Sequence, residues 1–220
     1  MTEPTAGGRG GLPRIPIARE GWPFIAVPLV AAGLLALAGR RRAAALVALP
    51  GLASLGFFRD PERSAPAVPG ALLAPADGRV MGVAHIEDRW VGPATRVSIF
   101  LSPLDVHVNR APITGVVRAV EWVPGRFVAA YRPEASEDNE RCTLSLEGDG
   151  VRVAVSQIAG VLARRIVCRA RPGDKLAAGE RYGLIRFGSR TDLTMPRAVD
   201  LRVQVGDRVT GGESIMAVLA

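Results

Sequence analysis

The segment GDKLAAGE at residues 173–180 returns as GDRVTGGE at residues 206–213. A second echo lies upstream, where the pattern Ala-Pro-x-x-Gly-x-Val stands at residues 74–80 and again at residues 111–117. Both patterns are typical of turns, because glycine tolerates positive φ and aspartate hydrogen-bonds its own backbone. Short apolar and β-branched runs lie between them, at residues 78–83, 95–101, 115–122, 142–146, 151–157 and 182–185. This spacing predicts a mainly β protein.

The turn pattern resembles that of lipoyl and biotinyl carrier domains. The resemblance implies a flattened β-sandwich with lipoyl/biotinyl-like hairpins, in which the two Gly-Asp hairpins bracket Ser189. Turn chemistry alone could also produce the repeats. The 25 glycines and 17 prolines favour short strands joined by many turns over long helices.

The first 63 residues have a different character. Residues 22–39 and 43–58 carry no charge and are separated by Arg40-Arg41-Arg42. As helices they would measure about 27 Å and about 24 Å, against a bilayer core of about 30 Å. We expect an N-terminal α-helical membrane hairpin, turned at the arginines and kinked at Pro28 and Pro50, that crosses the bilayer twice or enters one leaflet. A helix pair in the core of a water-soluble protein is the alternative.

A proline-rich linker at residues 60–70 follows the hairpin. The sequence therefore predicts a membrane-associating part at residues 1–63 and a β domain at residues 64–220, which is long enough to bury a sizeable core. Either placement of the hairpin returns the chain to the side of the membrane on which it began.

Charge and cysteine content limit the partners. Residues 1–63 hold eight arginines and four acidic residues, a net charge of +4 out of +7 for the chain. Positive charge beside apolar sequence favours an anionic phospholipid membrane as partner, and no nucleic-acid-binding motif occurs. Cys142 and Cys168 have no C-x-x-C spacing, so neither a metal site nor a disulfide framework is predicted. Free thiols indicate a reducing compartment.

Four motifs follow one another along the chain: APADG at residues 74–78, SPLDVHVNRAP at 102–112, EDNER at 137–141 and YGLIRFGSR at 182–190. Together they resemble the phosphatidylserine decarboxylase proenzyme family, and the chain looks most like its short bacterial and archaeal branch. The resemblance runs from about residue 21 to the C-terminus. It implies a lyase on the cytoplasmic side of the cell membrane that converts phosphatidylserine to phosphatidylethanolamine.

The resemblance also implies self-processing at Gly188-Ser189. Ser189 Oγ would attack the carbonyl of Gly188, divide the precursor into a β chain of residues 1–188 and an α chain of residues 189–220, and leave a pyruvoyl group on the α chain. This covalent cofactor would serve as the electron sink that amino-acid decarboxylation requires. The only lysine, Lys175, lies in a Gly-Asp turn, which argues against pyridoxal phosphate.

A serine hydroxyl needs an adjacent base at neutral pH. His107 lies in the second motif, whereas His85 is expected at the surface or on an edge strand. The family's Asp-His-Ser arrangement carries over to Asp77 as the carboxylate that orients His107. From the local sequence alone, Asp105 could orient the imidazole equally well, and Asp77-Gly78 could be an ordinary turn.

Four residues are candidates for binding the substrate. Longer family members have a second histidine where this chain has Arg110, whose guanidinium could bind a phosphate or carboxylate. Asn139, Arg141 and Arg190 could contact an anion or brace the cleavage turn, and structural ion pairs would explain them equally well. The residues leave open the lipid tails, the headgroup variant and whether the chain forms a homo-oligomer.

A protein without catalytic activity is the rival hypothesis: a membrane-anchored, lipoyl-like carrier or adaptor. A carrier needs an exposed lysine at a hairpin tip, and Lys175 lacks the neighbours that carrier families show. An adaptor would be expected to contain a long coiled coil, and no heptad repeat is present.

Overall fold

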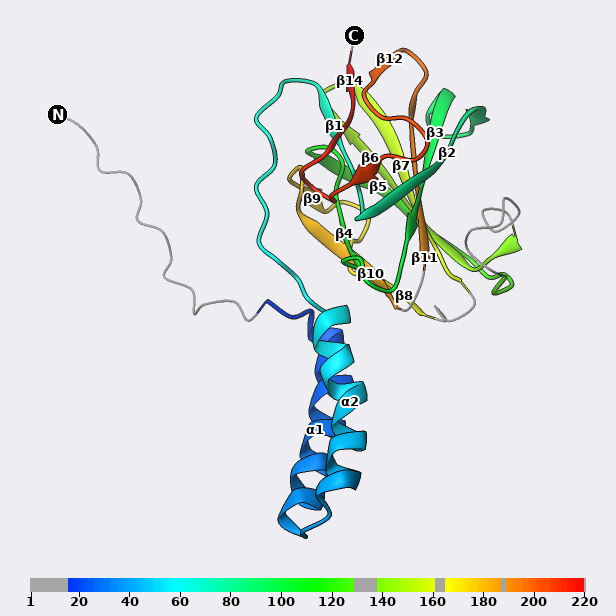
Figure 1. The fold of residues 1–220 in the computed structure, drawn as a ribbon. Coiled ribbons are helices and arrows are strands. Elements are labelled where there is room, and N and C mark those ends of the chain that lie inside the picture. The colour runs from blue at the N-terminus through cyan, green and yellow to red at the C-terminus, as the bar shows by residue number, and fades with distance from the viewer. Residues whose placement is uncertain (1–15, 129–137, 161–164, 187–188, 220) are drawn as a thin grey trace, which may run out of the picture.

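An apolar helical hairpin projects from one end of a β domain (Figure 1). The computed structural model describes residues 16–128, 138–160, 165–186 and 189–219. A short 3-10 turn at Arg19–Gly21 leads into α1 (Trp22–Leu37), and α2 is Arg41–Phe57. The two predicted helices are therefore confirmed. The turn between them differs slightly from the expectation, because α2 already begins at Arg41 and the tight turn is made at Gly39, where φ is +76°.

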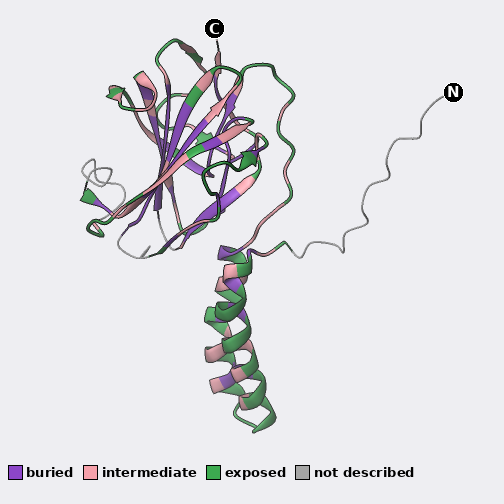
Figure 2. Cartoon of the chain, turned by 180° about the vertical axis from the view of Figure 1, so that it is seen from behind, coloured by how far each residue is buried: buried purple, intermediate pink, exposed green. Residues whose placement is uncertain are grey.

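The helices of the hairpin continue through both internal prolines, Pro28 and Pro50. They pack closely at Gly51, where an added Cβ would lie 3.0 Å from Leu29 Cγ. Much of the hairpin is exposed (Figure 2). Its exposed apolar side chains include Val27, Val30, Leu34, Leu37, Leu46, Leu49 and Leu52. A helix pair in a water-soluble core would have such side chains covered. Among the described residues, one helical segment, Arg19–Leu37, has the length and composition to cross a membrane.

The rest of the chain is mainly β, as predicted. The strands are β1 (Ala71–Leu73), β2 (Gly78–Asp88), β3 (Gly92–Leu101), β4 (Val108–Arg110), β5 (Gly115–Val123), β6 (Arg141–Gly148), β7 (Val151–Ile158), β8 (Arg165–Cys168), β9 (Lys175–Leu176), β10 (Arg181–Arg186), β11 (Ser189–Pro196), β12 (Val199–Leu201), β13 (Arg208–Val209) and β14 (Ile215–Leu219).

Within the described residues, the largest sheet has eight antiparallel strands in the order β13-β2-β3-β11-β7-β6-β5-β9. Two three-stranded sheets, β1-β14-β12 and β4-β10-β8, complete the domain. The main apolar cluster draws on β1, β3, β6, β7 and β11 and includes Leu72, Val97, Ile99, Leu144, Val155 and Leu193. The closer likeness to lipoyl and biotinyl domains stays a prediction.

The sequence repeats form two equivalent structural units. The first Ala-Pro-x-x-Gly repeat leads into β2, which pairs with β13 from the second Gly-Asp turn. The second Ala-Pro-x-x-Gly repeat leads into β5, which pairs with β9 from the first Gly-Asp turn. The units exchange equivalent main-chain bonds: Leu73 N donates to Pro112 O at 2.8 Å, and Arg110 N donates to Pro75 O at 2.9 Å. The domain therefore contains an internal two-fold relation that the sequence echo had indicated.

The proline-rich linker is packed against the β domain. Arg110 donates a hydrogen bond to the main-chain oxygen of Pro61 at 2.8 Å, and Arg181 pairs with Asp60 at 2.6 Å. The linker thus contacts the β domain already at Asp60 and Pro61, which precede the predicted boundary between residues 63 and 64. That boundary stays a prediction.

Candidate active site

Ser189 is the first residue of β11 and lies opposite Leu101 of β3. It is completely buried, and its Oγ has no hydrogen-bond partner among the described residues. A buried hydroxyl without a partner has a free-energy cost that ordinary packing does not explain, so it marks a candidate reactive group. Gly188, the other half of the expected cleavage site, lies outside the described residues.

His107 lies in the loop between β3 and β4 and is 2% exposed. Its Nδ1 lies 2.9 Å from the main-chain oxygen of Asp105, which can only accept, so Nδ1 carries the proton. Its own main-chain oxygen accepts a hydrogen bond from Ile185 N of β10 at 3.2 Å. The ring of Phe57, at the end of α2, lies 4.2 Å from the imidazole, centroid to centroid. The base of the helical hairpin therefore forms one wall around the histidine.

Burial lowers the pKa of His107 to about 4. The hydrogen bond to the Asp105 carbonyl and the negative charges of Asp105 and Asp77 raise this pKa in part, while the charge of Arg59 lowers it further. The imidazole is therefore neutral at physiological pH. With its proton on Nδ1, its Nε2 is the nitrogen that can accept a proton, as a general base requires.

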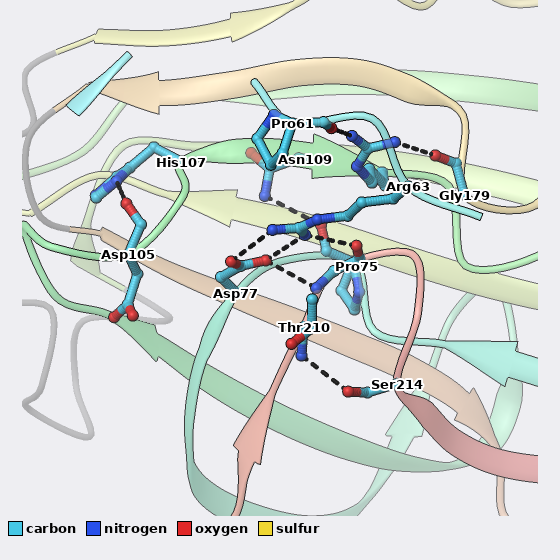
Figure 3. A network of polar contacts seen from close by, with 12 residues as sticks. Pro61, Arg63, Pro75, Asp77, Asp105, His107, Asn109, Gly179, Thr210 and Ser214 are labelled. Atoms are coloured by element: carbon cyan, nitrogen blue, oxygen red, sulfur yellow. Dashed lines mark hydrogen bonds and ion pairs between the residues drawn. The ribbon is translucent and has the colours of Figure 1, made fainter. Parts of the chain in front are cut away.

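Asp77 occupies the tight turn that precedes β2 (Figure 3). The following Gly78 has a φ of +149°, and an added Cβ would lie only 2.1 Å from Phe100 O, so only glycine fits there. The Asp77 carboxylate accepts hydrogen bonds from Arg63 Nη1 at 2.5 Å, Arg63 Nη2 at 2.8 Å and Gly211 N at 2.8 Å. These partners differ from the expected hydrogen bond to His107.

Asp105, the alternative orienting carboxylate, instead shapes the loop that carries His107. Its Oδ2 accepts hydrogen bonds from the main-chain nitrogen and hydroxyl of Ser102, and its Oδ1 accepts one from Arg208. Although burial opposes the effect, these bonds lower the pKa of the Asp105 carboxyl. The acceptor at Nδ1 of His107 is thus a main-chain oxygen, not either of the two proposed carboxylates.

Arg110 is occupied by the linker and the first Gly-Asp turn. Its side chain is 2% exposed and donates to Gly179 O at 2.9 Å and Pro61 O at 2.8 Å, with Asp60 at 3.5 Å. Arg190 lies on the face of β11 opposite to Ser189, where it pairs with Asp192 at 2.7 Å and donates to Ser98 Oγ at 2.6 Å. Both guanidinium groups therefore have protein partners, and the expected anion contacts stay predictions.

Asn139 is fully buried. Its side-chain amide exchanges two hydrogen bonds with the backbone of Val128 and donates a third to Ala159 O at 2.7 Å. Arg141 begins β6 opposite Ile158, the same residue that faces Arg190 from the other side. These hydrogen bonds of the Asn139 side chain all go to main-chain atoms, and its role in substrate binding or in bracing the cleavage turn stays a prediction.

Several residues near the site had no clear signal in the sequence. Phe57 and Arg63 belong to the hairpin and linker, which the motifs did not include. Asn109 is part of the second motif, and its side chain bonds Thr191 Oγ1 at 3.1 Å and accepts from Gln157 Nε2 at 2.9 Å. Thr191 shares a strand face with Ser189, so this buried polar row continues from the candidate reactive hydroxyl.

An apolar groove of about 920 Å³ opens where the hairpin meets the β domain. Its walls include Phe24, Val27 and Phe57 of the helices and Pro103 and Leu104 of the loop before His107. Leu104 is 82% exposed, and Arg59 reaches across to donate to Leu104 O. Phe57 lines the groove and contacts the imidazole, so an apolar ligand in the groove would lie beside His107.

The buried Ser189 hydroxyl, the buried neutral imidazole of His107 and the apolar groove beside Phe57 are the candidate parts of an enzyme site. The family model for phosphatidylserine decarboxylase matches residues 53–217. The chain belongs to the phosphatidylserine decarboxylase family.

Sequence similarity to known relatives extends over most of the chain. The phosphatidylserine decarboxylase proenzyme of Symbiobacterium thermophilum is 50% identical over 203 residues, covering 91% of this chain and 94% of that protein. The proenzyme of Nocardia farcinica is 48% identical over 212 residues, with 93% and 88% covered. That of Nitrosomonas europaea is 45% identical over 207 residues, with 91% and 94% covered. The hypothesis of a carrier or adaptor without catalytic activity is therefore wrong.

Proposed function

We propose that this protein decarboxylates phosphatidylserine to phosphatidylethanolamine at a pyruvoyl group made from its own Ser189. The observation that carries the proposal is the completely buried Ser189 Oγ without a hydrogen-bond partner among the described residues. Its relatives are named proenzymes, which supports activation by cleavage. The two products, residues 1–188 and 189–220, would remain together in the mature enzyme.

The proposed processing begins at Ser189 Oγ, which attacks the carbonyl carbon of Gly188 as its proton passes to His107. The peptide C–N bond breaks, the freed nitrogen takes up a proton, and an ester remains. Loss of the Cα proton of residue 189 then breaks the Cβ–O bond and releases the carboxylate of Gly188. Water converts the resulting dehydroalanine to the pyruvoyl group with release of ammonia.

His107 is suited to the first proton transfer because it is neutral and its tautomer is fixed. The bond from Nδ1 to the Asp105 carbonyl leaves Nε2 as the acceptor nitrogen. When Nε2 takes the proton, a positive charge appears in a buried site. The negative charge of Asp77, which favours the charged imidazole, would stabilise it. We therefore assign Asp77 an electrostatic role.

In the second stage, the pyruvoyl group supplies the electron sink that α-amino-acid decarboxylation requires. His107 would deliver a proton to the substrate carbon that has lost CO2. Because Arg110, Asn139 and Arg190 are held by protein groups, we assign them to bracing the site. Arg141 remains a proposed contact for the anionic headgroup.

The hairpin and the groove support a membrane-embedded substrate. We propose that the hairpin lies in an anionic phospholipid membrane, with the β domain on the cytoplasmic side, and that an acyl chain of the substrate occupies the groove beside Phe57. The free thiols of Cys142 and Cys168 agree with a reducing compartment. The headgroup would then reach His107 without leaving the membrane surface.

The processing test is the mass of the purified protein. Denaturing electrophoresis with mass spectrometry should show fragments of 188 and 32 residues, the smaller with a ketone in place of its amine. Ser189→Ala should remain one chain. A wild-type protein that stays intact while natively folded would overturn self-processing.

Attachment to membranes is tested by flotation with anionic phospholipid vesicles. The double variant Val30→Glu/Leu34→Glu places charges on the exposed apolar face of α1 and should reduce flotation strongly. Val205→Glu is a matched control, since Val205 is similarly exposed but lies on the β domain. Equal flotation of the wild-type protein, the double variant and Val205→Glu would contradict the membrane role of the hairpin.

A further inference from the structure

The internal two-fold relation gives Asp77 a structural counterpart. Asp77 occupies the same position in its Ala-Pro-x-x-Gly repeat as Thr114 does in the other. Each side chain accepts a hydrogen bond from the equivalent Gly-Asp turn: Gly211 N donates to Asp77 Oδ1 at 2.8 Å, and Ala178 N donates to Thr114 Oγ1 at 3.0 Å. A single neutral oxygen is therefore enough to close this turn.

Asp77 adds a negative charge and a second oxygen that the turn does not need. The chain places Arg63 opposite this charge, with Nη1 on Oδ1 and Nη2 on Oδ2, and Nη1 also donates to Gly211 O at 2.7 Å. The Arg63 and Asp77 side chains are only 7% and 15% exposed. Withdrawing such a pair from water is costly, and a neutral acceptor would preserve the turn. This cost suggests a use for the charge beyond the scaffold.

Main-chain contacts connect the pair to the proposed reaction. Gly78, next to Asp77, packs against the main-chain oxygen of Phe100, and the following residue of that strand, Leu101, faces Ser189. The Pro75 carbonyl of the same turn accepts hydrogen bonds from the main chain of Arg110 and the side chain of Asn109. Among the charges that act on His107, those of Asp105, Arg59 and Asp77 are the largest.

We propose that Arg63 is a positioning residue for self-processing: its two-pronged contact fixes the Asp77 carboxylate in the place from which its charge acts on His107. The inference rests on the proposed roles of Asp77 and His107. Bidentate arginine–carboxylate contacts fix orientation as well as charge, which lysine or a neutral side chain cannot reproduce. Arg63 lies in the linker, so the segment that joins the hairpin to the β domain helps to assemble the site.

The test compares cleavage rates of full-length precursors synthesised in a cell-free system with anionic phospholipid vesicles. Samples taken over time are resolved by denaturing electrophoresis and checked by mass spectrometry. Arg63→Gln should cleave roughly 10- to 100-fold more slowly, the range typical for residues that orient a reacting group. Arg63→Lys should be intermediate, and millimolar guanidinium should partly restore Arg63→Gln, which a misfolded protein would not show.

Arg181→Gln is the matched control. Arg181 anchors the same linker through Asp60 and Glu62, and its described contacts do not include Asp77. We expect it to cleave at close to the wild-type rate. Equal slowing by Arg181→Gln and Arg63→Gln would reduce Arg63 to a linker anchor and overturn the inference, as would normal or faster cleavage of Arg63→Gln.

Asp77→Asn separates this inference from the proposed function. If Arg63 acts through Asp77, the double variant Arg63→Gln/Asp77→Asn should be no slower than the slower single variant. Slow cleavage of Asp77→Asn with normal cleavage of Arg63→Gln would overturn only the role of Arg63. Normal cleavage of Asp77→Asn would overturn the role of Asp77 in the proposed function. It would also overturn the proposal that Arg63 positions the Asp77 carboxylate.

Discussion

In the first Ala-Pro-x-x-Gly repeat the carboxylate of Asp77 closes the turn, whereas in the second repeat the hydroxyl of Thr114 closes it. The two turns hold equivalent main-chain bonds, since Gly212 N donates to Ala74 O and Gly179 N donates to Ala111 O, both at 2.8 Å. The backbone scaffold is thus the same in both halves. The difference shows that the turn does not require the negative charge that Asp77 carries.

The two repeats also lead into different parts of the β domain. The first leads through β2 and β3 into the loop that carries His107, while the second leads through β5 and β6 into β7. The first unit therefore joins the charged turn to the buried imidazole, and β11 brings Ser189 alongside β3. The proposed base and its charged neighbour therefore lie in one half of the repeated scaffold.

Among variants that distinguish the two halves, we expect a substitution of His107 to have the largest effect on self-cleavage. His107→Gln removes the proposed base and should slow self-cleavage by about 10² to 10⁴. His85→Gln serves as the control, because His85 lies exposed on β2, as predicted from the sequence. The time course of precursor disappearance measures both. Normal maturation and normal decarboxylation by His107→Gln would show that another group transfers the protons.

The buried state of His107 also predicts a pH effect on stability. The folded pKa of about 4 lies below the unfolded value of 6.5, so between these pH values the unfolded chain binds a proton that the folded chain does not. Stability should therefore fall as the pH drops through this window, by roughly 3 kcal/mol in total. Below about pH 4 this loss is complete.

Denaturant unfolding in a Ser189→Ala background, where each protein is one chain, measures this effect. His107→Gln should remove the contribution, and the difference between the two proteins isolates it from the carboxylates that titrate in the same range. Identical pH profiles for the two proteins would contradict the neutral, buried imidazole.

The third prediction converts the first turn into the second. Arg63→Gln/Asp77→Thr removes the ion pair but keeps an oxygen for Gly211 N, as at Thr114. Its unfolding free energy should stay within about 1 kcal/mol of the parent, because one neutral hydrogen bond replaces a costly pair. Self-cleavage should slow by about 10². An unfolded variant would show that the pair belongs to the scaffold.

The smallest effect is expected in the second turn. Thr114→Val removes the acceptor for Ala178 N and should destabilise the protein by about 1 kcal/mol, the usual net value of one hydrogen bond. The rate of self-cleavage should not change. A slower rate with wild-type stability would mean that the second half takes part in the chemistry.

The sequence alone determined the fold class and named the candidate reactive residues. Six strands (β2, β3, β5, β6, β7 and β10), the two helices and the repeats were predictable because turn chemistry and runs of apolar residues are local properties of the chain. β11, which begins at Ser189, was not among the predicted strands. Ser189 and His107 could be named from short motifs, and the family model that matches residues 53–217 confirms the family that those motifs resemble. At the hairpin turn, α1 ends and α2 begins two residues earlier than the uncharged stretches had indicated, a difference that is common at helix ends.

Only the tertiary structure decided what each charged side chain contacts. Asp77 meets Arg63 and Gly211, Arg110 holds the linker, and the acceptor at His107 is a main-chain oxygen. These contacts join segments that are far apart in the chain, such as residues 77 and 211. Partners of this kind depend on how the sheets pack and on which groups lose water there, and no local pattern records that.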